Sequence, residues 1–127
     1  DGALAPLQAE FLALEGLSHL KRTIDLVSER LNPRLALEGI VLTMMDRRMR
    51  LAEAVAADVR SHFGDIVYKA EIPRNVRVSE APSHGKPVLL YDLQCSGSRA
   101  YLKLAREFLR REKVLPPKGH SKMGQAA

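Results

Sequence analysis

The apolar run Gly39–Met45, with the sequence GIVLTMM, is the feature that most constrains the fold of this chain. It has the length of a strand and lies between two segments of helical periodicity. Continuous apolar strands are typical of parallel sheets, in which both faces of the sheet are covered. The run therefore predicts a buried strand in a parallel sheet.

Two helices are predicted to flank this strand. Between Glu10 and Leu31 the apolar side chains recur at spacings of three and four residues, which places them on one face of a long helix. That face consists of Phe11, Leu14, Leu17, Leu20, Ile24, Val27 and Leu31. Asn32-Pro33 ends the helix, because proline lacks a backbone donor and restricts the residue before it. The second helix has apolar side chains four residues apart, at Leu51, Val55, Val59 and Phe63.

Further strands and a last helix complete the predicted pattern. The stretch DGALAPL at the start contains a short apolar strand, and Ile66–Pro73 alternates apolar with polar side chains, as in a strand with one less buried face. Val88–Tyr91 is predicted to be a short strand, and a helix is predicted from about Ser98. The predicted apolar stripe of this helix is Tyr101, Leu104, Ala105 and Phe108.

The order of these elements predicts an α/β fold with a mostly parallel sheet. So few strands would leave one edge of the sheet bare, and we therefore expect a part of the protein upstream of this sequence. Ligands of such sheets bind beyond the carboxyl ends of the strands. Two arginine-rich segments follow predicted strands there: MMDRRMR and the long loop Glu71–Asp92.

Composition narrows the class of protein. The 127 residues are 46% apolar and 28% charged, as in a single folded domain, and no apolar run reaches the roughly 18 to 20 residues of a membrane span. The N-terminus shows no secretory leader pattern, so an intracellular, soluble protein is expected. The single Cys95 cannot form an internal disulfide, and the four histidines lack the spacing of a zinc site, so no metal site is predicted.

The net charge of +5 is unevenly distributed along the chain. Residues 99–122 hold eight basic and two acidic side chains, a net of +6, and residues 1–98 hold 12 basic and 13 acidic, a net of −1. A basic end of this kind is either a solvated helix face with a tail or a surface that attracts nucleic acid. The charge alone does not decide between these two interpretations.

Three motifs resemble one family over nearly the whole predicted domain, from about Asp1 to Arg111. The motifs PLQAEFLALEGLSHL, GIVLTMMDRR and IPRNVRVSEAPSHGKPVLLYD closely resemble the C-terminal half of the ParA/Soj chromosome-partitioning ATPases, which are deviant Walker-type P-loop proteins. The resemblance implies that residues 1–112 are the C-terminal half of such a domain, a mostly parallel P-loop NTPase-type sheet flanked by helices. The basic remainder, residues 113–127, lacks periodicity and is predicted to be a disordered tail.

The motifs that this family places earlier in its sequence are absent here. These are the Lys-Gly-Gly-Val-Gly-Lys-Thr-Thr phosphate loop, the aspartate that orients the attacking water and the Asp-Cys-Pro-Pro motif on the magnesium side. A phosphate loop needs successive backbone N–H groups, and Gly16, Gly39, Gly64 and Gly85 are isolated in this sequence. No catalytic residue is therefore predicted, and this chain alone is not expected to hydrolyse ATP.

The resemblance implies that the loop after Ile72 wraps the adenine of a nucleotide, with Pro73 and Asn75 at the base and Met44 packing near it. A backbone held rigid by proline can present hydrogen-bonding groups to a base, and an amide side chain can both donate and accept. Core packing is the alternative for Met44 and its neighbour Met45, and a turn role is the alternative for Asn75.

The resemblance also implies that Arg48 and Arg77 contribute to sequence-independent binding of double-stranded DNA. Guanidinium groups suit phosphate oxygens, although a solvated or ion-paired arginine is the alternative for each. Six further basic residues could extend this surface: Arg47, Arg50, Arg60, Lys69, Arg74 and Lys86. The chain departs from the family at Arg50, where an asparagine is usual, and so loses a predicted helix cap and gains a positive charge.

The function implied for the full protein is that of a partitioning ATPase. It would bind ATP and Mg²⁺ through the missing N-terminal half, form a homodimer, coat nucleoid DNA non-specifically in the cytoplasm, and be released when a ParB-type centromere-binding protein stimulates hydrolysis. The alternative is a truncated, non-catalytic module that binds DNA or interferes with dimerisation. A MinD-like membrane-surface ATPase is disfavoured, because the end of the sequence has no apolar helix face.

Overall fold

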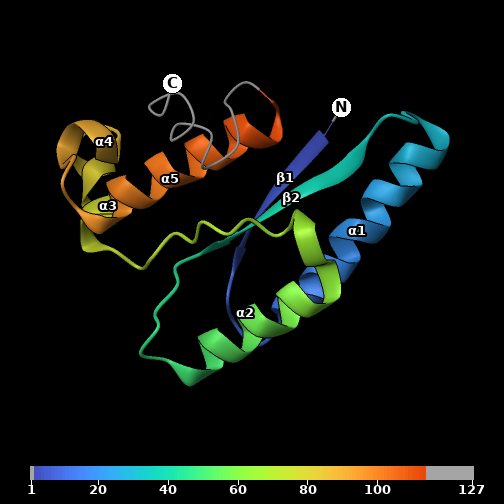
Figure 1. The fold of residues 1–127 in the computed structure, drawn as a ribbon, viewed down its shortest axis with the longest axis horizontal. Helices are drawn as coiled ribbons and strands as arrows, with labels where there is room; N and C mark the ends of the chain where they lie inside the picture. Colours follow the sequence, from blue (N-terminus) through green and yellow to red (C-terminus); the bar gives the residue numbers. More distant parts are fainter. Residues whose placement is uncertain (1, 114–127) are drawn as a thin grey trace, which may run out of the picture.

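The computed structural model describes residues 2–113 and contains a small parallel sheet with helices on both faces (Figure 1). The predicted tail, apart from Lys113, lies outside these residues. In chain order the elements are β1 (Gly2–Gln8), α1 (Ala13–Arg30), β2 (Ala36–Thr43), α2 (Arg50–Phe63), the 3-10 turn η1 (Gly64–Ile66), α3 (Val76–Glu80), the 3-10 turn η2 (Ala81–His84), α4 (Val88–Tyr91) and α5 (Ser96–Arg111).

The sheet pairs β1 with β2 in parallel, and the register places Leu7 opposite Leu42. The predicted strand Ile66–Pro73 runs beside β2 but pairs with it only at two isolated bridges, Ile40 with Val67 and Met45 with Pro73. Between these bridges the backbone N–H groups of residues 69 and 70 donate instead to a side-chain carboxylate of α5. The predicted third strand is therefore an extended segment whose ladder is interrupted.

The larger core lies between the sheet and the helices α1 and α2. Successive side chains of a strand point to opposite faces, so Ile40 and Leu42 enter this core while Val41 faces the other side. Its buried members are Ala9, Ala13, Leu17, Ile40, Leu42, Met45, Ala52, Val55, Ala56, Val59 and Val67. The predicted periodicity of the first two helices is confirmed in part. Leu17, Ile24, Val55 and Val59 are buried, whereas the predicted stripe members Phe11, Leu20, Leu31 and Leu51 are exposed.

The smaller core lies under α5, on the opposite face of the sheet from α1 and α2 (Figure 1). It consists of Val41, Tyr68, Ile72 and Ala100, with the partly buried Leu104 packed against them. The predicted apolar stripe of α5 is wrong in part, because Tyr101 and Phe108 are 38% and 41% exposed. The side of the helix that faces the sheet becomes polar after Leu104, and Glu107 and Arg111 take the next two positions.

The predicted strand at Val88–Tyr91 is wrong, because these residues form the single helical turn α4. The N–H groups of Leu90 and Tyr91 both donate to the carbonyl of Pro87, at 3.0 Å. The fully buried Ser98 hydroxyl donates to the carbonyls of Val88 and Asp92, at 3.1 and 2.6 Å. These bonds occupy the backbone groups that a strand would need for pairing.

Within residues 2–113, no helix is long and apolar enough to cross a membrane. The same residues contain no cluster of three or more side chains that could hold a metal ion.

Candidate functional site

A cavity of about 620 Å³ opens beyond the carboxyl end of β2. The loop after β2, the extended segment 69–74 and the first turns of α5 line it. Its lining residues are Met45, Asp46, Arg47, Arg48, Lys69, Ala70, Glu71, Pro73, Arg74, Ser96, Arg99, Ala100 and Lys103. The cavity thus lies where ligands of parallel sheets bind, and cations dominate its wall.

Two of the predicted site residues line this cavity, and three do not. Pro73 and Arg48 are in the wall, whereas Met44, Asn75 and Arg77 are outside it. The structure therefore separates the residues predicted on the base side: Pro73 faces the cavity and the other two lie beyond its rim.

Met44 and its neighbour Met45 differ in environment. Met45 is 6% exposed and belongs to the larger core, so the packing alternative is correct for this residue. Met44 is 39% exposed and has φ of 51°, in the left-handed region that a non-glycine residue seldom adopts. The reversal of the backbone at Met44 turns its side chain away from the core that holds Met45.

The side chain of Asn75 holds the start of the long loop in place. Its amide oxygen accepts from the N–H of Arg77 at 2.9 Å and caps α3, and its amide nitrogen donates to Ser96 Oγ at 2.7 Å. The turn role considered for Asn75 is therefore present. One amide hydrogen and one lone pair remain for other partners.

Arg48 forms an ion pair with Asp46. Its Nε and Nη2 atoms donate to the two carboxylate oxygens, both at 3.0 Å, although 89% of the arginine side chain is exposed. The side-chain hydrogen bonds from Arg48 lower the pKa of Asp46, and the bonds to Asp46 raise the pKa of Arg48. The alternative of a paired arginine is therefore realised, at a position open to solvent.

Arg77 lies among the short helices of the long loop. It contacts the carboxylates of Glu80 and Asp92, each at 3.4 Å, and Tyr91 donates to Glu80 at 2.8 Å. Hydrogen bonding with Tyr91 and the two nearby carboxylates raise the pKa of Arg77. The hydrogen bond to Glu80 raises the pKa of Tyr91 in turn. Arg77 is thus also ion-paired, in a cluster separate from that of Arg48.

Glu71 connects the wall of the cavity to α2. It accepts from Arg47 and from Arg60, both at 2.9 Å, and Arg60 also donates to the carbonyl of Tyr68 at 3.1 Å. Two of the six additional basic residues are therefore structural ion-pair partners of Glu71. Their sequence spacing gave no sign of this shared carboxylate.

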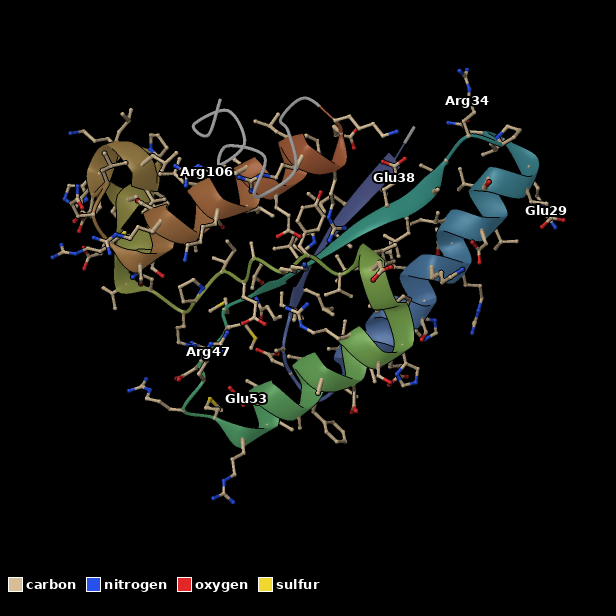
Figure 2. All side chains as sticks on the ribbon, viewed as in Figure 1. Glu29, Arg34, Glu38, Arg47, Glu53 and Arg106 are labelled. Atoms are coloured by element: carbon tan, nitrogen blue, oxygen red, sulfur yellow. The ribbon has the colours of Figure 1, made fainter. Side chains whose placement is uncertain are left out.

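The basic segment 99–122 contains a line of cations on α5 that its net charge alone did not reveal. Arg99, Lys103, Arg106 and Arg110 recur at spacings of four, three and four residues, so they share one side of the helix. Arg106 lies on α5, and Arg47 lies beyond the carboxyl end of β2 (Figure 2). The helical spacing of the α5 cations is visible in the sequence, but there the spacing was compared among apolar side chains and not among basic ones.

Comparison with known proteins identifies similar sequences over most of the chain. A family described as "CobQ/CobB/MinD/ParA nucleotide binding domain" matches residues 3–100. The chromosome partitioning protein ParA of Caulobacter vibrioides is 68% identical over 113 residues, which cover 89% of this chain and 42% of that protein. The sporulation initiation inhibitor protein Soj of Bacillus subtilis is 52% identical over 107 residues, which cover 84% of this chain and 42% of that protein.

A solved structure shares the fold. Cobyrinic acid a,c-diamide synthase from Mycobacterium smegmatis, with bound ADP and magnesium, superposes with a TM-score of 0.65 at 29% identity. The match covers 88% of this chain and 38% of that protein. The chain therefore has an α/β fold of the P-loop NTPase type, and it spans about two fifths of the length of the relatives that it matches.

Proposed function

The chain belongs to the CobQ/CobB/MinD/ParA nucleotide-binding family, within its ParA/Soj chromosome-partitioning group, and on this premise we propose that it is the C-terminal half of a partitioning ATPase. The observation that carries this proposal is the 68% identity to a chromosome partitioning ParA over 89% of the chain. The full protein would bind ATP, dimerise and bind DNA without sequence preference.

Two observations support the assignment to one half of a larger domain. The relatives are more than twice as long as the matched region. Within the described residues β1 pairs only with β2, so one edge of β1 is open, and Leu4 on this strand is 45% exposed. Native proteins normally pair, cover or otherwise protect a strand edge of this kind. We propose that the upstream half supplies the neighbouring strand.

We propose that Pro73, Asn75 and Met44 form the base side of a nucleotide site. Pro73 presents a rigid backbone to the cavity, whereas Asn75 and Met44 lie outside its wall. Asn75 retains one donor and one acceptor, and the exposed Met44 can pack against a ring. Glycines lie singly in the described residues, and no metal-ligand cluster is present there. The phosphates and Mg²⁺ would therefore be held by residues of the upstream half.

Arg48 and Arg77 are proposed to contact DNA phosphates. Both are ion-paired in this structure, but the side chains are 89% and 54% exposed. Solvent-exposed ion pairs contribute little to stability, so a phosphate can replace the carboxylate at little cost. The further proposed partners are a ParB-type protein that stimulates hydrolysis and a second copy of the full chain, with action in the cytoplasm on the nucleoid.

The experiment that tests this function uses the full protein encoded by the complete reading frame. We expect ATP hydrolysis that increases when DNA and ParB are both present, and ATP-dependent DNA binding that weakens in the variant with Arg48→Ala and Arg77→Ala. The control is Arg22→Ala with Arg30→Ala, which removes two exposed charges from α1. An intact protein whose hydrolysis does not respond to ParB and DNA would refute the proposal.

The truncated-module alternative is tested by the coding sequence upstream. A continuous reading frame that encodes the phosphate loop supports the ATPase assignment. Its absence would favour a non-catalytic module that binds DNA or blocks dimerisation.

A further inference from the structure

The side of α5 that carries Arg99, Lys103, Arg106 and Arg110, here named the α5 basic stripe, borders two cavities. Arg99 and Lys103 line the cavity beyond β2 described above. A second cavity, of about 660 Å³, continues along the helix and is lined by Lys69, Ala70, Lys103, Arg106, Glu107, Arg110 and Arg111. Because Lys69 and Lys103 line both, the two cavities form one continuous basic surface.

The cations of this stripe are not neutralised within the described residues. Arg99 donates to the uncharged amide oxygen of Gln94 at 3.3 Å, and no ion pair forms at Lys103 or Arg106, both of which are exposed. The loop arginines differ in this respect, since Arg48 and Arg77 each have a carboxylate partner. The stripe therefore presents uncompensated positive charge to solvent.

Glu107, the carboxylate in the second cavity, is paired with groups outside the stripe. Glu107 accepts from Arg111 at 3.0 Å and from the N–H groups of Lys69 and Ala70, both at 2.9 Å. Arg110 also has a buried Nε with no hydrogen-bond partner among the described residues. Buried donors are nearly always paired, so this N–H is an unsatisfied donor, and the contact with an anion is left to the terminal amino groups of the guanidinium.

We propose that the α5 basic stripe is a second phosphate-binding surface and that the backbone of duplex DNA lies along α5. This inference rests on the proposed function, because it extends the DNA surface from the loop arginines to a helix on which no DNA contact has been assigned. The four cations span about 16 Å at 1.5 Å per residue, which suits a polymer of phosphates better than one small anion.

The chemistry of the surface favours the duplex backbone over exposed bases. Neither cavity is lined by an aromatic side chain. Single-strand binding relies on bases stacked on aromatic rings, whereas lysine and arginine alone bind phosphates irrespective of sequence. The stripe is therefore expected to add affinity without adding sequence preference.

The test compares two double variants of the full protein in the presence of ATP. Lys103→Gln with Arg106→Gln removes two charges from the stripe, and Arg22→Gln with Arg30→Gln removes two charges from α1, on the other face of the sheet. For the stripe variant we expect duplex affinity to fall about tenfold at 50 mM salt, and the slope of log K against log salt to become shallower by about 2. The control should retain the wild-type slope.

The outcomes separate this inference from the proposed function. Wild-type protein that fails to bind duplex DNA with ATP would remove the proposed function and the inference together. Wild-type binding, with equal slopes for the stripe and control variants, would overturn the inference alone. The charge-preserving variant Lys103→Arg with Arg106→Lys should bind as wild type, and a loss there would show that the side chains act through the fold and would also overturn it.

Discussion

The two faces of the sheet are held in different ways. Within residues 2–113, the core under α1 and α2 contains eleven buried apolar residues, whereas the core under α5 contains four, with Leu104 packed beside them. Towards its C-terminal end α5 is joined to the sheet by polar contacts. Arg111 donates to the carbonyls of Ile66 and Val67 at 3.2 and 3.1 Å, and its guanidinium lies 3.9 Å from the centre of the Tyr68 ring.

This difference shows that the highly charged helix α5 can be joined to the sheet by hydrogen bonds where few apolar side chains are available. One side chain, Glu107, receives two backbone N–H groups of the extended segment, which keeps these donors satisfied where the ladder with β2 is interrupted. Hydrogen bonds to charged groups contribute about 1.5 to 3 kcal/mol each. The second face therefore depends on a few directional bonds, and the first on the burial of many side chains.

The largest expected effect is on the apolar face. Leu42 is fully buried in the larger core, and Leu42→Ala should lower the free energy of unfolding by about 3 to 4 kcal/mol, because it leaves a cavity. Urea denaturation of the full protein measures this loss. Leu90→Ala, at a side chain that is 74% exposed, is the control and should change stability by less than about 0.5 kcal/mol.

On the polar face we expect Glu107→Gln to cost about 2 kcal/mol, since it removes the charge that receives two N–H groups and Arg111. The matched control is Glu112→Gln, an exposed carboxylate one turn further along the chain. Hydrogen exchange of the amides of residues 69 and 70 should accelerate in the first variant only. Equal denaturation midpoints for the two variants would contradict the distinction between the faces.

A smaller effect is expected where α5 meets the loop helices. A Cβ at Gly97 would lie 2.4 Å from Cγ2 of Val78, so Gly97→Ala should destabilise the protein by about 1 to 2 kcal/mol through overpacking. Thermal denaturation measures the loss. Adding Val78→Ala should restore part of it, and a double variant less stable than the sum of both single changes would rule out this contact as the cause.

The smallest expected effect concerns Asp46. Asp46→Asn releases Arg48 from its ion pair, and duplex DNA affinity of the full protein at low salt should rise about two- to threefold. The folded pKa of Asp46 is lowered below 3.8, so the pair persists at neutral pH and is lost only as pH falls through that lowered value. The gain should therefore be the same at pH 6 and pH 8, and a gain that changes between them would contradict this pairing.

The elements of the apolar face were predictable from the sequence. The strand β2 and the helices α1 and α2 follow from apolar side chains at a strand-like run and at helical spacing. Residues 39–42 of the run are buried, but only a part of each predicted helix stripe is. Val88–Tyr91 was mistaken for a strand because four apolar residues fit either structure. The helical turn is stabilised by hydrogen bonds to the carbonyl of Pro87 and from the hydroxyl of the buried Ser98. Ser98 lies outside the run of four apolar residues, so the run alone could not reveal this bond.

The packing of α5 was predicted less well. An amphipathic helix was expected to bury apolar side chains towards the sheet. Instead Glu107 and Arg111 face the sheet, where they hydrogen-bond to the backbone N–H of Ala70 and the carbonyl of Val67. The family resemblance assigned site roles to Pro73, Asn75, Met44, Arg48 and Arg77. The contacts of these residues with a nucleotide or DNA stay predictions. The ion pair between Arg77 and Asp92 could not be inferred, since it depends on how the long loop folds back.

Helix α5 is anchored at both ends. Ser98 bonds its first turn to the carbonyls around α4, and Arg111 bonds its last turn to the carbonyls of residues 66 and 67. A helix fixed in this way presents its side chains in a preorganised spacing, and because Val88 and Asp92 belong to the long loop, a change in that loop would be transmitted to the first turn of α5. A nucleotide bound beside the loop, as proposed, would then change the loop arginines and the near end of the α5 basic stripe together, whereas the far end, which Arg111 fixes to residues 66 and 67, would change less.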